Sequence, residues 1–388
     1  MKIKISSLVS ILSVVLVCSP ILTQAQYQTL NNSYGVSGGN INDITRSFCC
    51  SGTLGSLVTG GGTLYVLSNN HVLARQDRAA AGEDISQPGL IDNGCQPPRI
   101  VADFTAAPHL GNNVDCAIAA LRPNTMNTTG AIQGLNGGTG AQPPSTTTMN
   151  PSVGMAVQKS GRTTGHTTGN VGSTNTSVNV QYQLQCGKGR KYTISYTNQV
   201  VINGSGFSAG GDSGSLILTN TTCAHPVALL FAGSSSDTIG NPIGDVLSAL
   251  GGVGHPVSFV GQTCTGPNSP QQGAQSFQLP QQALDRASRV LEQNRHDLMS
   301  RPAVLGVGLG ALEDNSAPAV VVYIDKTSSA QPQLPAQVDN VPVRVIMTDP
   351  FIAFGTAQTY TARGSFSFRA HGSFLSSSAA AGHSDCRR

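Results

Sequence analysis

The sequence predicts a mainly β fold with a small mixed α and β region toward its C-terminal end. Its 388 residues include 45 glycines and no tryptophan, and only 11% are charged, a composition typical of many short strands joined by turns. Several segments between residues 52 and 233 alternate apolar and polar residues, as half-buried strands do. Residues 281–299 instead place apolar side chains at helical spacing on a charged background. The length allows one large domain or two moderate ones.

The first 25 residues have the pattern of a secretory signal peptide. Lys2 and Lys4 precede an apolar run over residues 8–17, and a break at Pro20 leads to a small residue at Ala25. The run is too short to cross a bilayer, and no later segment is long and apolar enough to do so. We therefore expect a secreted or periplasmic protein without a membrane span. The polar, glycine-rich residues 26–45 are expected to form an N-terminal arm.

Charge and cysteine content narrow the function classes further. The formal charge of +3 is small and dispersed, so a nucleic-acid partner is not expected. Without Cys18 an even number of cysteines remains, and in an oxidising compartment this predicts two or three disulfides of undetermined connectivity. The only close Cys and His pairs, Cys223 with His225 and His383 with Cys386, are isolated in the sequence, so a metal site is not expected. The cysteines are Cys49, Cys50, Cys95, Cys116, Cys186, Cys223, Cys264 and Cys386.

Three polar residues lie in sequence contexts that are typical of catalytic side chains. A hairpin is expected from residues 52–58 and 63–68, and His71 follows its second strand, where it can face a cleft. Asp115 lies in an apolar segment, so its burial requires a hydrogen-bonding partner. Ser213 lies in the glycine-rich stretch 206–215, just before an apolar strand at 216–218. Glycines there allow a tight turn that exposes the hydroxyl beside converging backbone N–H groups.

Further strands are expected on both sides of Ser213. Residues 227–233 are apolar without alternation, which indicates a strand buried on both faces. The alternating segments before Ser213 are residues 153–159, 167–171, 178–182 and 192–196.

The composition changes after Cys264. Residues 264–280 are rich in Gln, Pro and Gly and are expected to form a linker. The helix predicted at 281–299 and strands at 304–309, 319–324 and 343–347 make a small α+β module over residues 281–356. Gly306–Gly310 lie inside a strand that no helix follows, so they are a poor dinucleotide fingerprint. The Ser- and Ala-rich residues 357–388 are expected to form a disordered tail.

The three chemical residues and their contexts resemble a known family. The order His71, Asp115, Ser213, together with the sequence Gly-Asp-Ser-Gly-Ser at 211–215, is similar to the trypsin-like serine proteases of the chymotrypsin fold (PA clan). Residues 52–55, 67–72, 160–165 and 230–234 resemble a bacterial-style branch that is related to the plant narrow-leaf-type proteins. The resemblance covers about residues 45–262. It implies a chymotrypsin-like double six-stranded β-barrel, with a protease domain at 46–263.

The resemblance also implies roles for individual residues. Ser213 would attack the substrate carbonyl, His71 would accept its proton, and Asp115 would hold the imidazole in the productive tautomer. The N–H groups of Gly211 and Ser213 would form the oxyanion hole. Asp212 is the chief competitor of Asp115 for the orienting role, but it neighbours the nucleophile in the turn, where relatives use this position structurally.

Substrate contacts are implied at three positions. Ala232 and Gly233 would pair with the substrate backbone, and Phe207 would lie at the base of the specificity pocket, where the lack of an acidic group argues against a strict Arg or Lys preference. The expected function is that of a secreted serine endopeptidase that acts on proteins or peptides and requires no cofactor. The alternative is a catalytically silent chymotrypsin-fold binding or surface protein. Cleavage specificity, activation by processing and oligomeric state do not follow from the sequence.

Overall fold

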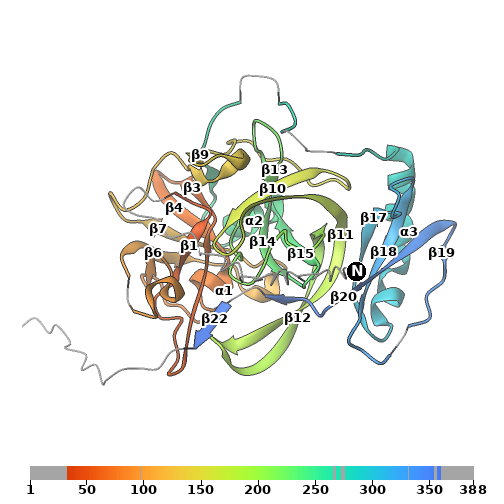
Figure 1. Cartoon of the computed structure of the whole chain (residues 1–388), viewed down its shortest axis with the longest axis horizontal. Coiled ribbons are helices and arrows are strands. Elements are labelled where there is room, and N and C mark those ends of the chain that lie inside the picture. Colours follow the sequence, from red (N-terminus) through yellow and green to blue (C-terminus); the bar gives the residue numbers. More distant parts are fainter. Residues whose placement is uncertain are drawn as a thin grey trace, which may run out of the picture.

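The computed structural model describes residues 33–96, 98–264, 268–271, 276–330, 332–353 and 356–359. The predicted signal peptide and all but the first three residues of the predicted tail lie outside these residues. Within the described residues, no helix is both long and apolar enough to cross a membrane. Two barrels and a sheet covered by a helix lie in a row (Figure 1), in chain order from red to blue.

The first barrel contains the strands that lead to His71 and Asp115. Its sheet has the order β3-β4-β7-β6-β5-β1-β2, and β2 leads through Gly55 directly into β3. This connection closes a ring of six strands when β2 and β3 are counted as one bent strand. The predicted hairpin is confirmed as β3 and β4, which pair from Ser56–Leu67 to Gly60–Thr63. The bounds are β1 Val36–Asn40, β2 Phe48–Leu54, β3 Ser56–Gly60, β4 Thr63–Ser68, β5 Asp84–Ser86, β6 Ile100–Ala106 and β7 Ala117–Leu121.

The second barrel is closed by strand pairing alone. Its strands have the order β10-β13-β14-β15-β12-β11, and β10 also pairs with β11. The predicted double six-stranded barrel is therefore confirmed. The strands expected at 167–171 and 178–182 are in fact parts of one long strand, β11, whose pairing with β12 shifts register several times. The bounds are β10 Ala156–Gly161, β11 Gly165–Gln185, β12 Lys188–Asn203, β13 Leu216–Thr219, β14 Pro226–Gly233 and β15 Asp237–Pro242, with helix α2 following at Ile243–Gly252.

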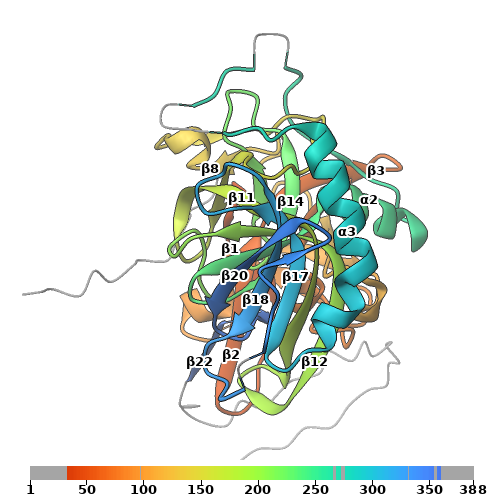
Figure 2. The same cartoon turned by 90° about the vertical axis from the view of Figure 1, so that its right-hand side faces the viewer.

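The C-terminal region is fused to the second barrel. The predicted helix and three strands are confirmed as α3 (Gln281–Ser300), β17 (Val304–Ala311), β18 (Pro318–Asp325) and β20 (Val341–Thr348). However, β17 pairs with β11 along Ser173–Gly310 to Val178–Gly306, so one sheet runs from the barrel into this region. Helix α3 crosses one face of β17 and β18 (Figure 2), and its apolar face packs on them. The predicted α+β module is thus present, and its sheet continues that of the second barrel.

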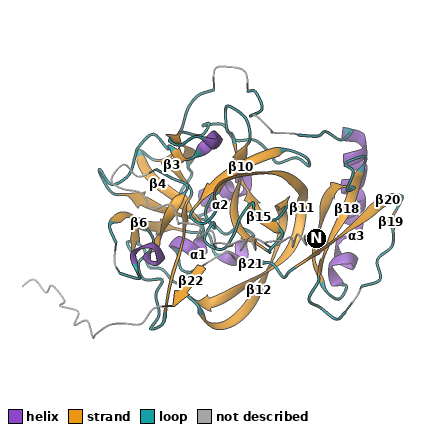
Figure 3. Ribbon diagram, viewed as in Figure 1, coloured by secondary structure: helices purple, strands orange, loops and turns teal. Residues whose placement is uncertain are grey.

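Two expected boundaries are wrong. Residues 36–40, expected in an arm, form the buried strand β1, which pairs with β2 on one side and β5 on the other. Their burial comes from strand partners rather than from apolar side chains. Past β20, the short strands β21 (Ile352–Ala353) and β22 (Thr356–Thr359) return to the two barrels (Figure 3), so the first residues of the predicted tail are ordered strand.

Candidate active site

A one-turn helix carries His71. Helix α1 (Asn70–Leu73) follows β4 after a single residue, Asn69. The Asn69 side-chain amide donates to the backbone carbonyl of Asp115 (2.6 Å), and the Asn70 amide donates to the carbonyl of Pro108 (2.9 Å). These two hydrogen bonds hold α1 against the segment that precedes β7, so His71 and Asp115 face each other.

Asp115 is fully buried and accepts three hydrogen bonds through its carboxylate. His71 Nδ1 lies 2.6 Å from Oδ2, and the backbone N–H of His71 donates to Oδ1 (3.1 Å). The Tyr182 hydroxyl donates to Oδ2 (2.8 Å). Because a buried carboxylate needs such donors, Nδ1 carries the proton that points at Asp115. His71 Nε2 is left as an acceptor, and it has no hydrogen-bond partner among the described residues.

Tyr182 on β11 is a site residue that the sequence predicted only as part of a strand. Burial, followed by the Asp115 charge, raises the pKa of the Tyr182 phenol well above its usual value, so the hydroxyl stays protonated and donates. Its oxygen is 2.7 Å from the Tyr196 hydroxyl, and its ring lies edge-on to His71 with centroids 6.2 Å apart. A tyrosine at an inward position of a strand needs a partner for its hydroxyl, which is the sequence signal that could have indicated this role.

Ser213 lies in a tight turn next to α1. The turn includes Gly211 at φ +100°, a conformation that favours glycine. A Cβ on Gly52 would lie 2.5 Å from Val72 Cγ2 and 3.0 Å from the Ser213 carbonyl oxygen, so β2 holds the turn beside α1. The Ser213 hydroxyl donates to the carbonyl of Phe231 (3.1 Å) rather than to His71. Within the described part of the chain, the N–H groups of Gly211 and Ser213 donate to no acceptor.

Asp212 is engaged in holding this turn. Its carboxylate accepts from the backbone N–H groups of Thr163 (2.8 Å) and Ala209 (2.9 Å) and from the Thr164 hydroxyl (2.8 Å). The ammonium of Lys159 lies 3.7 Å away, and both side chains are fully buried. Asp212 therefore has a structural set of partners and makes none of its observed contacts with His71.

Lys159 on β10 was also missed as a site residue. Burial lowers the pKa of its ammonium to about 8, although the Asp212 charge acts in the opposite direction. The ammonium also donates to the carbonyl of Gly165 (2.8 Å). Because a fully buried lysine requires a counter-ion, a lysine inside a predicted strand is the signal that could have indicated this pair.

The three residues expected to contact substrate are all buried. Phe207 is 4% exposed and packs in the core of the second barrel with Val157 and Ile202, and it does not line the pocket beside His71. Ala232 and Gly233 are buried on β14, where both pair with β21. The substrate edge that the sequence predicted on β14 is thus covered by the chain's own C-terminal part.

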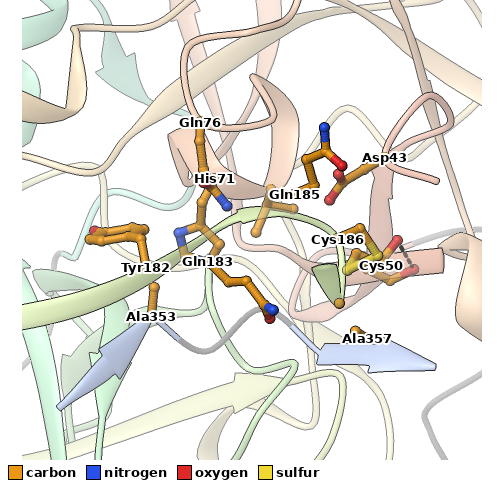
Figure 4. A pocket seen from close by; sticks show the side chains of 13 residues that line it. Asp43, Cys50, His71, Gln76, Tyr182, Gln183, Gln185, Cys186, Ala353 and Ala357 are labelled. Carbon is orange, nitrogen blue, oxygen red and sulfur yellow. Dashed lines mark hydrogen bonds between the residues drawn. A yellow bond between two sulfur atoms is a disulfide. The ribbon is translucent and has the colours of Figure 1, made fainter. Parts of the chain in front are cut away.

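A pocket opens beside His71 (Figure 4). Tyr182 and the Cys50–Cys186 disulfide form part of its wall, and Ala353 of β21 and Ala357 of β22 complete it. Ser213 does not line this pocket.

Asp43 is the acidic group in the pocket wall. Burial raises its pKa to about 6, while Arg78, 3.8 Å away, acts in the opposite direction. This carboxyl therefore changes charge in the mildly acidic range.

Four of the described cysteines form two disulfides, Cys116 is free and buried, and Cys223 and Cys264 belong to an open cluster. Cys49 pairs with Cys95, and Cys50 pairs with Cys186, which links β2 to the β11–β12 hairpin. The ligand atoms of Cys223, His225 and Cys264 lie within 4.8 Å of one another, although the sequence suggested that Cys223 and His225 were isolated. Cys386 lies outside the described residues. The three-residue cluster is remote in sequence from the elements that carry His71 and Asp115.

Comparison with known proteins gives fold-level likeness only. No family model and no curated protein matches the chain. Solved structures with likeness include a glutamic acid specific serine protease described as using a histidine triad in substrate binding, at 24% identity and TM-score 0.41, covering 59% of this chain and 100% of that chain. Thermobifida fusca protease A has 18% identity and TM-score 0.37 over 58% and 98% of the two chains. Cellulomonas bogoriensis chymotrypsin has 17% identity and TM-score 0.37 over the same shares.

Proposed function

We propose that this chain is an exported serine endopeptidase that hydrolyses peptide bonds of protein or peptide substrates. The observation that carries the proposal is the buried Asp115–His71 pair, which leaves Nε2 as an acceptor. His71 lies on α1, and the glycine turn of Ser213 packs next to this helix. Two disulfides support export, because disulfides persist in oxidising compartments. Proteins and peptides are the substrate class because the β14 edge can pair with an extended main chain.

The mechanism follows from these side chains. The Ser213 hydroxyl rotates away from the Phe231 carbonyl, attacks the substrate carbonyl carbon and gives its proton to His71 Nε2. The oxyanion that forms accepts from the N–H groups of Gly211 and Ser213. The intermediate collapses to an acyl-Ser213 ester as His71 returns the proton to the leaving amine. Water, deprotonated by His71, then hydrolyses the ester and restores the Ser213 hydroxyl.

Asp115 stabilises the imidazolium throughout this cycle. Its carboxylate accepts hydrogen bonds from the backbone N–H and from Nδ1 of His71, and these two contacts fix the ring. The Tyr182 hydroxyl holds the carboxylate in place. Asp115 rather than Asp212 takes this role in the proposal because the Asp212 oxygens are occupied by turn donors and Lys159.

A fluorophosphonate probe tests the proposal. We expect a covalent adduct on Ser213 after prolonged incubation of the folded chain, mapped by mass spectrometry. His71→Ala should lower the labelling rate about a hundredfold or more, as expected for loss of a general base. It should still fold, because the residue 71 N–H and the Tyr182 hydroxyl still bind Asp115. The proposal fails if Ser213 remains unlabelled both in the natural chain and in variants in which β21 no longer pairs with β14.

One observation favours the second candidate, a catalytically silent binding protein. Ser213 is 0% exposed and its hydroxyl is bound to Phe231. The same labelling experiment separates the two functions, because a silent protein gives no His71-dependent adduct even when β21 is displaced from the edge of β14.

A further inference from the structure

The part of the β14 edge that β13 leaves unpaired is covered by another strand of the same chain, β21. Strand β15 covers one edge of β14 as far as Gly233, whereas β13 covers the other edge only as far as Leu229. At Ala232 and Gly233 this second edge is paired instead with Ala353 and Ile352 of β21, in antiparallel orientation. An extended peptide that adds to a sheet edge makes the same main-chain pairing.

A second strand from the same segment covers the first barrel. Strand β22 pairs antiparallel with β2, from Phe48–Thr359 to Ser51–Thr356. Ala353 of β21 and Ala357 of β22 both line the pocket that contains His71 (Figure 4). Strand β21 thus pairs with the second barrel and β22 with the first, and both lie beside His71. Residues 354–355, which join the two strands, are not described.

Strand β21 is anchored by the residues just before it. Phe351 is 0% exposed and packs in an apolar cluster with Tyr323 and Phe231. Its carbonyl accepts from the backbone N–H of Gln181 on β11 (2.9 Å). Thr348, at the end of β20, donates to the buried Asp237 (2.7 Å). These contacts deliver the chain to the β14 edge in one fixed position.

Both catalytic candidates are almost inaccessible, and the two strands line the pocket of one of them, His71. Ser213 is 0% exposed and His71 is 5% exposed, yet an incoming peptide must reach both. An occupant on the same chain competes at a high effective concentration, so a free peptide must displace it. A buried phenylalanine anchor and pairing with both barrels favour the covered arrangement over the open one.

We propose that β21 and β22 form a built-in, substrate-like inhibitor that occupies the peptide groove between the two barrels until it is displaced. This inference rests on the proposed function for its consequence, which is a latent peptidase. The groove itself is a binding site for an extended peptide whether or not Ser213 reacts.

Two variants should open the groove. Phe351→Ala removes the buried anchor, and Ile352→Pro removes the N–H at the residue that pairs with both Gly233 and Gln181. Ile352 is itself 45% exposed, so the second variant leaves the core intact if Phe351→Ala fails to fold. Met347→Ala is the matched control, because Met347 is also 45% exposed but lies on β20 and does not line the groove pocket.

The first measurement uses binding, which does not need catalysis. In a Ser213→Ala background, a fluorescent peptide with the sequence of residues 350–359 is added and its anisotropy is followed. The opened variants should bind it at least about tenfold more tightly than the natural chain or the Met347→Ala control. Equal affinities in all four proteins, or no binding by any, would overturn the proposal.

The second measurement is the fluorophosphonate labelling rate of Ser213 in each protein. The opened variants should react at least about tenfold faster than the natural chain, and the added peptide should slow them. Equal rates in all proteins that do react would show that the groove is already open and contradict the proposal. If no protein is labelled but only the opened variants bind the peptide, β21 and β22 still occupy a peptide-binding groove, and the peptidase function falls.

Discussion

One oxygen of Asp115 receives hydrogen bonds from both His71 and Tyr182, and this shared oxygen is central at the scale of single residues. The carboxylate is fully buried, so its position depends on its donors rather than on solvent. The second barrel also fixes the backbone of Asp115, because the Asp115 N–H donates to the side-chain oxygen of Asn241 on β15 (2.9 Å). Residues of both barrels therefore orient the imidazole.

Tyr182→Phe tests this shared oxygen. The variant keeps the ring contacts but removes one hydrogen bond to a charged acceptor, which is worth about 1.5–3 kcal/mol. We expect the labelling rate at Ser213 to fall about tenfold or more, since each 1.4 kcal/mol is a factor of ten. Kinetic labelling of the natural and variant chains measures this, and circular dichroism checks the fold. An unchanged rate would show that Tyr182 does not position Asp115.

Lys159 and Asp212 connect a strand of the second barrel to the turn that carries Ser213. The ammonium of Lys159 has a lowered pKa of about 8 because of its burial. Between pH 8 and about 10.5 the unfolded chain binds more protons, so this group alone makes the free energy of unfolding rise with pH. However, above pH 8 Asp212 also loses the positive charge beside it, and the turn loses a restraint.

The expected result is a labelling rate that falls as the pH rises through about 8. Lys159→Met, which is uncharged at every pH, should show a low rate already at pH 7 and no further fall. It should remain folded at pH 7, because the Asp212 carboxylate keeps its hydrogen bonds from Thr163, Ala209 and Thr164. Labelling between pH 6 and 10 and urea denaturation at pH 7 supply the data. A wild-type rate that stays level to pH 10 would refute a role for this ion pair in the turn.

Among the helices and strands, those with a regular apolar pattern could be predicted from the sequence. Strands that are defined by their pairing partners could not. The hairpin at 52–68 and the helix at 281–299 followed from their apolar periodicity. Strand β1 contains Gly38 and Gly39 and is buried by its neighbours, so its composition suggested an arm. The single strand β11 was divided in two because its register shifts interrupt the alternation.

The same limit applies to the candidate site. The resemblance singled out His71 and Asp115, and the structure places their side chains in hydrogen-bond contact, while the catalytic role of each remains a prediction. Tyr182 and Lys159 come from other strands and meet the site only through the closure of the second barrel. Strand β21 could not be located from the sequence, because its partner on β14 is more than a hundred residues away and two residues carry no periodicity.

At the scale of the whole molecule, the barrel and the C-terminal region share one sheet and adjoining cores. Strand β17 covers the edge of β11, and Tyr323 of β18 is buried against residues of the second barrel. Its hydroxyl is 2.9 Å from the Ser173 hydroxyl on β11. Removal of residues 281–356 would expose this edge and these side chains to water.

We therefore expect the second barrel and the C-terminal region to unfold together. Scanning calorimetry should show no separate transition for residues 281–356, and a chain that ends at residue 264 should be insoluble or unfolded, since the exposed sheet edge and apolar face favour aggregation. A stable, folded fragment of that length, or a resolved second transition that limited proteolysis assigns to residues 281–356, would contradict the continuous sheet.

Fluorophosphonate labelling tests both the peptidase function and the covered groove. Its site and rate are measured in the natural chain, the Ile352→Pro variant and their His71→Ala counterparts. We expect an adduct on Ser213 in both parent proteins, formed faster in Ile352→Pro, and a labelling rate about a hundredfold or more lower in each His71→Ala protein. Folded proteins that form no adduct on Ser213, or whose labelling does not depend on His71, would contradict this expectation.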